Sequence, residues 1–486
     1  MSSSYKPDVI IFMTDEERAI PPYEAPEVLE WRDNVLSGRN WFKDNGVSFN
    51  RHYTGSLACV PSRPTLFTGQ FPDVHGVTQT DGLGKDAYDA RMRWLAPREV
   101  PTLGHWFRAA GYDTHYDGKW HISHADLIDE STGKPLATNT SDGTILHDAV
   151  KQYLEMNPLN EYGFSGWVGP EPHGALLGNS GIIRDPLIAD RTVRWLEDRY
   201  RRRNLGDSDA LKPFLLVVSF VNPHDIVLLP LYMRRPENNP YLPSDFDPPD
   251  IPIPPTRYED LSSKPAAQIA YKYSYYSGYG VQRAVQRLYE SNEQEYRNLY
   301  YRMHLEVDNP LDMVRKAVIA DGSREKIIFR TSDHGDLLGA HGGLHQKWFN
   351  LYDEATRVPF EIVKYGGTQS PKAVIDSVPT SHVDLIPTAL ALAGLDQNYL
   401  GEHLAPQFSE FHPLPGRDLS PLLEDPGISE FKNRAVYFMT RDNMLEGDTL
   451  ASAVARGLGQ AEKPPRALKI QVLSHASTNF EGIVVK

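Results

Sequence analysis

Residues 214–224 read FLLVVSFVNPH, a run that is apolar except for one serine, followed by a polar turn that ends in a histidine. A short apolar run of this kind is typical of a strand that is buried on both faces of a sheet. Residues 185–199, just upstream, have the spacing of an amphipathic helix. A helix that leads into a buried strand indicates a parallel sheet with helices packed on its faces.

The same alternation of helix and strand recurs along the chain. We expect further strands at 9–13, 112–116 and 327–329, and helices at 101–110, 292–318 and 382–393. Proline at the start of the 101–110 segment and glycine directly after it are common helix boundaries. The expected fold class is therefore α/β, with a large, mostly parallel central sheet sandwiched by helices within residues 1–400.

Two regions depart from this alternation. Residues 229–280 are dense in proline and tyrosine, and we interpret them as a long surface excursion that could serve as a substrate loop. After residue 400, a proline-rich stretch precedes three short strand-like runs, at 435–439, 468–473 and 482–485. These runs predict a smaller C-terminal α+β subdomain, residues 401–486, with its own small sheet. Because the chain stops on an apolar run, we expect the sequence to be truncated.

The composition excludes several classes of protein. The net charge of the 486 residues is −14, and a diffusely acidic surface is unsuited to nucleic acid or anionic membranes. It suits a divalent cation site built from carboxylates. The first apolar run ends at Met13, too short for a signal peptide or a spanning helix, so we expect a cytoplasmic protein. A single cysteine, Cys59, excludes an intrachain disulfide framework.

Four of the expected strands end in polar, mostly ionisable residues. In open α/β sheets, ligands bind outside the carboxyl ends of the strands, so we expect these side chains to converge on one site. The residues concerned are Asp15, Glu16, Lys119, His121, Asn222, His224, Asp333 and His334.

Cys59 begins the segment CVPSRPTLFTG, in which Pro61 suits the first turn of a helix. The thiol would then lie at a helix N-terminus, where the backbone favours negative charge, and Arg63 one turn later would offer a fixed fork to an oxyanion. A buried structural cysteine is one alternative. A thiolate phosphatase is another, but its loop needs a wider spacing between cysteine and arginine than the three residues found here.

Cys59-Val60-Pro61-Ser62-Arg63, with Leu66, Thr68 and Gly69 behind it, resembles the sulfatase signature C-x-P-S-R-x-x-x-L-x-T-G. The likeness extends over about residues 8–400. It includes GKWH (118–121), which resembles the family's lysine–histidine pair, the strand-end His224, and residues 332–360, which resemble its second metal segment with a downstream lysine. The resemblance implies a type I, formylglycine-dependent sulfatase of the alkaline phosphatase superfamily.

In that family a formylglycine-generating enzyme oxidises the signature cysteine, and the hydrated product presents a gem-diol. The resemblance therefore implies that Cys59 is the precursor of the nucleophile, that Lys119 and Arg63 hold the diol, and that the substrate is a small sulfate monoester. His224 and Lys347 would face the leaving group as general acid and electrostatic partner. His121 would later remove the remaining hydroxyl proton, expelling sulfate and regenerating the aldehyde.

The same resemblance implies one divalent cation, with Asp15, Glu16, Asp333, His334 and the modified Cys59 as ligands, and with Asp333 also accepting the nucleophile's proton. Calcium is the family default, while the imidazole ligand makes manganese or magnesium the alternatives. The family usually has two adjacent aspartates after the first strand, and here the second is Glu16. Glu16 would therefore bind the cation from a shifted position, or would contact the ligands without binding the cation itself. Glu17 is a less favoured replacement for the second aspartate.

Two other functions remain open on the sequence. A phosphonate monoester or phosphodiester hydrolase would use the same nucleophile, although Lys119 and His121 favour a sulfatase. A catalytically silent metal- or anion-binding member is the other, and the complete signature segments speak against it. We expect three further histidines to be rim or packing residues and not ligands: His75, His341 and His345.

Overall fold

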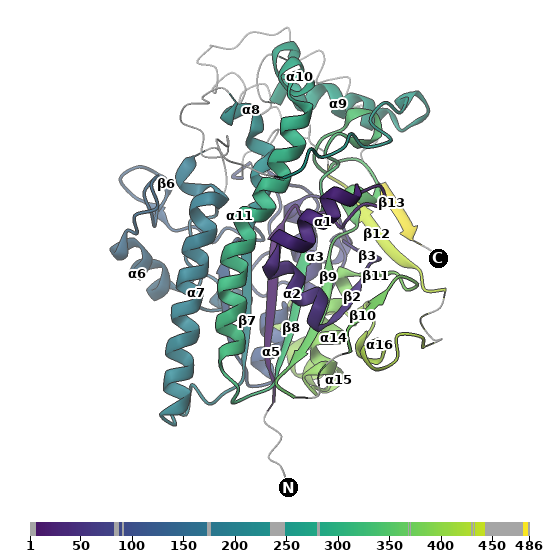
Figure 1. Ribbon diagram of the computed structural model, residues 1–486. Coiled ribbons are helices and arrows are strands. Elements are labelled where there is room, and N and C mark those ends of the chain that lie inside the picture. Colours follow the sequence, from purple (N-terminus) through teal and green to yellow (C-terminus); the bar gives the residue numbers. More distant parts are fainter. Residues whose placement is uncertain are drawn as a thin grey trace.

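A seven-stranded sheet runs through the middle of the molecule (Figure 1). The computed structural model describes residues 6–81, 87–89, 92–172, 176–233, 248–278, 282–367, 369, 371–428, 431, 433–442 and 480–484. In sheet order the strands are β10 (Ala373–Ile375), β2 (Val47–Phe49), β9 (Phe360–Tyr365), β8 (Lys326–Ser332), β1 (Asp8–Asp15), β7 (Phe214–Pro223) and β4 (Asp113–Gly118). Only β9 runs antiparallel to its neighbours in this sheet, which confirms the predicted mostly parallel α/β architecture.

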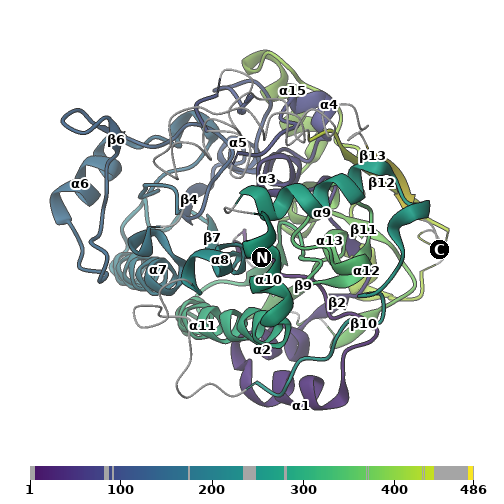
Figure 2. The ribbon, with the colours of Figure 1, turned by 90° about the horizontal axis from the view of Figure 1, so that it is seen from above.

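The sequence of β1 explains why helices cover both faces of the sheet. Its side chains alternate between faces, and all are apolar from Val9 to Met13, so neither face can be left in water. One face packs against α2 (Ser37–Asn45), α7 (Gly181–Asn204) and α11 (Glu293–Ala320). The other packs against α3 (Cys59–Thr68), α5 (Leu103–Ala109), α14 (Leu385–Leu392) and α15 (Gln397–Leu404). Figure 2 shows the two groups of helices on opposite sides.

The predicted core elements are confirmed with small changes in their bounds. The helix predicted at 382–393 begins as a 3-10 turn, His382–Asp384, and continues as α14. The strand expected at 468–473 lies outside the described residues. The remaining elements are short or lie at the periphery: α1 (Pro26–Val35), α4 (Pro72–His75), α6 (His147–Met156), α8 (Leu229–Tyr232), α12 (Ala340–Gly343), α13 (Asp353–Thr356), α16 (Ser420–Glu424), β3 (His52–Tyr53), β5 (Ile128–Asp129), β6 (Lys134–Pro135) and β11 (Thr380–Ser381).

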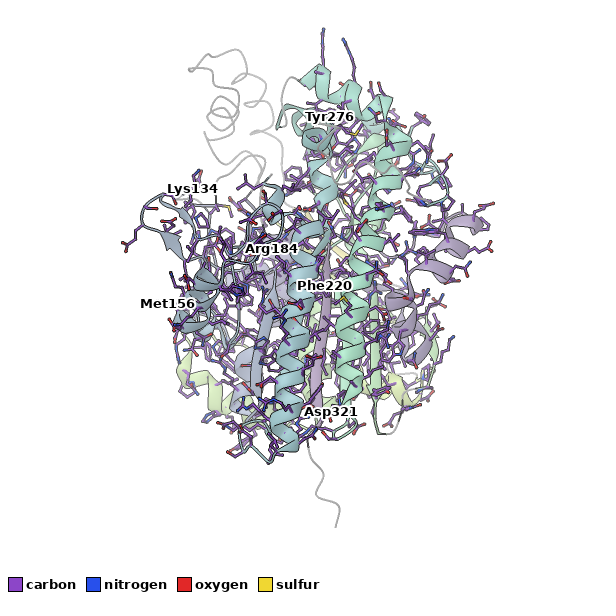
Figure 3. All side chains as sticks on the ribbon, turned by 60° about the vertical axis from the view of Figure 1, so that its left-hand side comes forward. Lys134, Met156, Arg184, Phe220, Tyr276 and Asp321 are labelled. Carbon is purple, nitrogen blue, oxygen red and sulfur yellow. The ribbon has the colours of Figure 1, made fainter. Side chains whose placement is uncertain are left out.

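The proline- and tyrosine-rich stretch contributes a cap beyond the carboxyl ends of the parallel strands. It contains α9 (Ala266–Gly278), which is followed by α10 (Gln282–Ser291). Figure 3 shows Tyr276 of α9 at one end of the molecule and Asp321, which precedes β8, at the other, with Phe220 of β7 between them. The stretch is therefore not wholly a surface excursion, because Tyr271, Tyr275 and Tyr276 are buried in a core of their own.

The C-terminal segment returns to the main body. In it, β12 (Val436–Thr440) pairs with β13 (Phe480–Val484), and the backbone N–H of Met439 donates to the carbonyl of Gly55 at 3.1 Å. The subdomain boundary at residue 400 stays a prediction. No helix in the described part of the chain is both long enough and apolar enough to cross a bilayer.

One buried carboxylate joins this segment to the body of the fold. Asp384 accepts hydrogen bonds from the guanidinium of Arg434 at 2.5 and 2.7 Å and from the backbone N–H groups of Ser381 and Arg417, each at 2.8 Å. Asp384 is fully buried and Arg434 is nearly so. Removing one partner of such a pair leaves the other charged and desolvated.

We therefore expect Asp384→Ala to lower the free energy of unfolding by about 3–5 kcal/mol, the cost of leaving one member of a buried ion pair unpaired. Urea denaturation measures this change. The matched control is Asp396→Ala, which removes an exposed carboxylate that caps α15 and should cost only about 1 kcal/mol. Equal losses in the two variants would contradict the role of the Asp384–Arg434 pair.

Candidate active site

The polar residues at the strand ends meet around Cys59. Its Sγ lies 3.2 Å from Nε2 of His334 and 3.5 Å from Nζ of Lys347. It also lies 3.7 Å from Oδ1 of Asp15 and 3.9 Å from Nζ of Lys119. All five residues are buried. The last residue of β1 and side chains that follow β4 and β8 thus lie in one cluster with the first residue of α3, at the edge of the sheet where ligand sites are expected.

Cys59 begins α3, as predicted from the proline two residues later. Burial raises the pKa of the Cys59 thiol to about 12, and the Asp15 carboxylate adds to the shift, while Lys119 and Lys347 oppose it. At neutral pH the side chain is therefore a protonated thiol. Because the thiolate is the reactive form, this environment does not suit a phosphatase that uses cysteine directly.

Arg63, one turn along α3, ties the acidic residues together. Its Nε donates to Oδ2 of Asp333 at 2.9 Å and its Nη2 to Oδ2 of Asp15 at 2.8 Å. Its Nη1 donates to the carbonyl of Lys119 at 2.7 Å. The guanidinium is fully buried, so it fixes the ends of three strands relative to the helix that carries Cys59. Its predicted contact with an oxyanion stays a prediction.

Lys119 forms the shortest ion pair in this cluster, 2.6 Å from Nζ to Oδ2 of Asp15. Burial alone would raise the pKa of Asp15, but the positive charges of Lys119, His224 and Arg63 outweigh it and hold that pKa well below its ordinary value. The pKa of Lys119 is raised, because the attraction of Asp15 exceeds the effect of burial. Both groups are therefore charged at neutral pH.

Glu16 turns away from the strand with a positive φ of 66°. Its backbone N–H donates to Oδ1 of Asp333 at 3.1 Å, and its Oε2 accepts from Nζ of Lys347 at 2.9 Å. Oε1 is buried and has no hydrogen-bond partner among the described residues. Burial, with help from the Asp336 carboxylate, raises the pKa of Glu16 well above its ordinary value despite Lys347.

These side chains fit a divalent cation. One candidate ligand atom each from Asp15, Cys59, Asp333 and His334 lie within 4.8 Å of one another, and the same holds for Asp15, Glu16 and His224. A buried carboxylate oxygen without a partner, as in Glu16, is what a cation would satisfy. Burial lowers the pKa of His334 to about 4, so its imidazole is neutral, and Nδ1 lies 3.0 Å from the carbonyl of Gly335. That contact leaves Nε2, which faces Cys59, to act as a ligand.

The two predicted acid–base histidines lie on different sides of the cluster. His224 follows β7, and its ring joins Asp15 and Glu16 in the second ligand group. The imidazole of His121 is paired with Asp81, with 2.8 Å between Nε2 and Oδ1. The backbone N–H of His121, whose φ is 53°, donates to Oε1 of Glu171 at 2.6 Å. Asp81 thus orients the ring of His121, and Glu171 fixes its backbone.

Several residues of the site escaped the sequence analysis. Asp336 lies in the same SDHGD segment as Asp333, so the motif could have indicated it. No motif or periodic pattern marks the others as site residues, and only the folded chain brings them to the strand ends. The missed residues are Asp81, Glu171, Ser219, Asp336 and Asp442.

Glu17 and the three other histidines have partners among the described residues. Glu17 is held by Arg39 and Arg330 in a buried ionic network, and lies in neither ligand group. His75 contacts the hydroxyl of Thr65. The ring of His341 lies between the carboxylates of Glu259 and Glu354, and His345 is surrounded by tyrosines that include Tyr271, Tyr275 and Tyr276. These tyrosines pack against the loop that carries Lys347.

Comparison with known proteins yields one family. The family model described as Sulfatase matches residues 33–395. The chain is 27% identical over 395 residues to an uncharacterised sulfatase, YidJ, of Escherichia coli (strain K12), covering 80% of this chain and 66% of that protein. The chain thus spans about two thirds of the length of the curated relatives it matches.

Solved structures show the same fold. A 2-O GAG sulfatase superposes with a TM-score of 0.58 at 20% identity, over 90% of this chain and 78% of that one. A phosphonate monoester hydrolase from Silicibacter pomeroyi superposes with a TM-score of 0.55 at 19% identity, over 90% and 80%. Because the family model covers well over half of its 486 residues, the chain belongs to the sulfatase family, within the alkaline phosphatase superfamily.

Proposed function

We propose that the protein hydrolyses sulfate monoesters to an alcohol and sulfate. The observation that carries this proposal is the position of Cys59 at the start of α3, within 4 Å of two ammonium groups, Lys119 and Lys347, and of a candidate metal ligand, His334. A sulfate ester is an anion whose sulfur is shielded by oxygens, so its hydrolysis needs positive charge and a nucleophile at the same place. The substrate class proposed is a small sulfate ester.

Cys59 is proposed to act after conversion to formylglycine by a formylglycine-generating enzyme. The signature around it supports this proposal, as does a thiol pKa of about 12, which leaves the unmodified side chain unreactive. The hydrated aldehyde would supply a hydroxyl nucleophile where Sγ now lies. Lys119 and Lys347 already lie beside that position and would hold it by charge.

Asp15, Asp333, His334 and the converted residue 59 would hold one divalent cation, with Glu16 at the edge of the site. Two groups of candidate ligand atoms support this placement of Glu16. Glu16 belongs to the group with Asp15 and His224, and not to the group that contains Asp333. The ion would neutralise sulfate oxygens and acidify the nucleophile. Calcium is proposed from the carboxylates, with manganese or magnesium as alternatives because of the imidazole.

The remaining groups divide the proton transfers. Asp333, which lies next to residue 59, is proposed to accept the nucleophile's proton. His224 would protonate the leaving alkoxide. Lys347 would stabilise the negative charge that develops on the leaving group. Its ammonium group is charged at neutral pH, because the Coulombic effects of Cys59 and Glu16 outweigh burial and raise its pKa above the ordinary value. His121, oriented by Asp81, would remove the proton that allows sulfate to leave.

Phosphonate monoester hydrolysis is the second candidate, favoured by the structural likeness to the enzyme from Silicibacter pomeroyi. Its chemistry needs the same nucleophile and cation. Lys119 and His121 favour the sulfatase, on the resemblance described above. A silent member of the family would have no use for so many buried charges around one thiol.

We expect the converted enzyme to hydrolyse a panel of aryl, alkyl and sugar sulfates faster than phosphonate monoesters. Cys59→Ala should lower turnover of every substrate by about 10³-fold or more, because the nucleophile is gone, while unfolding is unchanged. Peptide mass spectrometry reports the conversion of Cys59 in the wild type. Cys59→Ser should accumulate a sulfated serine, because it lacks the second hydroxyl. Preference for phosphonates would select the second candidate, and an active Cys59→Ala would contradict both.

Metal content should separate the ligands. Asp15→Asn, Asp333→Asn and His334→Ala should each lose most of the ion and most of the activity, because each removes a ligand. Glu16→Gln should cost at most about 10- to 100-fold in metal affinity, the range for groups that orient ligands. Elemental analysis of the four purified variants gives the answer. Full occupancy in Asp333→Asn would refute the proposed site.

The two histidines should differ in kinetics. His224→Ala should slow alkyl sulfates by about 10²- to 10⁴-fold, the usual size of general acid catalysis, and nitrophenyl sulfate much less, because nitrophenolate leaves without a proton. His121→Ala should slow all substrates to one common rate and show an initial burst of released alcohol, because it acts after the leaving group has gone. Stopped-flow assays resolve the burst. The reverse pattern would exchange the two roles.

A further inference from the structure

Asp442, two residues after the end of β12, brings the C-terminal segment to the edge of the candidate site. It is 1% exposed, and its Oδ2 accepts a hydrogen bond from the backbone N–H of Thr80 at 3.1 Å. The same oxygen accepts the indole N–H of Trp348 at 3.0 Å. The family match ends at residue 395, so Asp442 lies beyond the part of the chain that the family model covers.

The first of these contacts leads to His121. Thr80 precedes Asp81, whose Oδ1 lies 2.8 Å from Nε2 of His121. A hydrogen bond to the backbone N–H of Thr80 fixes the Gln79–Thr80 peptide unit, one residue before Asp81, and so limits where the Asp81 carboxylate can lie. Because a base is effective only when a third group holds its ring in place, the position of Asp81 affects proton transfer by His121.

The second contact leads to Lys347. Trp348 is the next residue in the chain, and Nζ of Lys347 lies 5.3 Å from the centroid of the Trp348 ring, close enough for a cation–π contact. The same Nζ lies 3.5 Å from Sγ of Cys59. An indole ring held by its N–H cannot rotate, so it forms a fixed platform beside the ammonium group.

A carboxylate is well suited to this position. Hydrogen bonds to an ionised acceptor are shorter and stronger than those to a neutral one. Breaking the hydrogen bonds to a buried carboxylate is also unfavourable, since an unpaired charge away from water costs several kcal/mol. Two loops that bind the same oxygen therefore cannot shift independently.

We propose that Asp442 is a positioning residue that holds the Asp81–His121 pair and Lys347 in one arrangement around residue 59. In this role it acts through Thr80 and Trp348. The C-terminal segment is then a functional part of the site, and not only a support for the sheet. The kinetic part of this inference rests on the proposed sulfatase function, and its structural part does not.

The kinetic test compares Asp442→Ala with Asp442→Asn. The alanine variant should lose about 10- to 100-fold in kcat, the range for groups that orient reactive side chains, with KM nearly unchanged. Asparagine keeps an oxygen that can accept both hydrogen bonds, and should restore most of the loss. The control is Asp425→Ala, an exposed acid of the same segment whose carboxylate bonds only the nearby N–H of Gly427 among its described contacts. Wild-type kcat in Asp442→Ala would overturn the proposal.

A double-mutant cycle with Trp348→Phe tests the shared oxygen. Phenylalanine keeps a ring beside Lys347 but lacks the indole N–H. Because both changes remove the same contact, the effects of Asp442→Ala and Trp348→Phe on kcat should combine to less than their product. Multiplicative effects would show that Asp442 does not act through Trp348.

Hydrogen exchange of the Trp348 indole gives a readout without activity. In ¹⁵N-labelled protein its signal is the one missing from Trp348→Phe. The indole proton should exchange slowly in the wild type and in Asp425→Ala, and quickly in Asp442→Ala. If the wild type cleaves no sulfate ester, the proposed function fails while this comparison still decides the positioning role. Equal exchange rates of the Trp348 indole proton in the wild type and Asp442→Ala would overturn the positioning role of Asp442. Should Asp442→Ala not fold, Trp348→Phe is the variant to test, because it removes only the donor of this hydrogen bond. Its kcat should fall, and a wild-type kcat would overturn the link through Trp348.

Discussion

The buried guanidinium of Arg63 is the constraint on which the site depends. It donates to Asp15 at the end of β1, to Asp333 after β8 and to the carbonyl of Lys119 after β4. It projects from the helix that begins with Cys59. Asp15 and Asp333 would repel each other and the cost of burying them would be prohibitive without this partner. The planar fork fixes their separation as well as their charge. A lysine at the same position would satisfy one carboxylate and leave the geometry of the other undefined.

The side chains around residue 59 form pairs of ammonium and carboxyl groups. Lys119 pairs with Asp15 and Lys347 with Glu16, so each ammonium group close to Sγ has its own carboxylate. Asp15 raises the pKa of Lys119, and Lys119 helps to hold the pKa of Asp15 well below its ordinary value. The pKa of Glu16 behaves differently, because burial raises it despite Lys347. Such a cluster is expensive to assemble, and the helices that cover both faces of the sheet stabilise it by keeping water out. Because the side chains of β1 from Val9 to Met13 are apolar on both faces of the sheet, helices cover both faces and keep water away from the charged site.

The parts of the site that could be predicted are those that follow from strand direction. Asp15, Lys119, His224 and Asp333 each stand after a buried run, and parallel strands bring such positions to one edge. Cys59 was placed at a helix start by Pro61. The positive φ of Glu16 has no signature in the sequence, so its turn toward Lys347 could not be foreseen. Asp81 and Asp442 are single acids in segments without periodic pattern, and only tertiary contacts reveal them. The sequence predicts a surface excursion at residues 229–280, because the spacing of its tyrosines does not distinguish a buried cap from a loop.

The burial of Cys59 sets an order of events in the life of the chain. The side chain is 3% exposed and enclosed by groups that precede and follow it by up to hundreds of residues. If Cys59 is converted to formylglycine as proposed, the modifying enzyme must reach the sulfur before the chain closes around it, and the conversion then precedes folding. Contacts between segments so far apart in sequence form slowly, which lengthens that interval. The residues nearest the C-terminus leave the ribosome last. The contact between Asp442 and the loops at residues 80 and 348 therefore forms only after both loops have been synthesised.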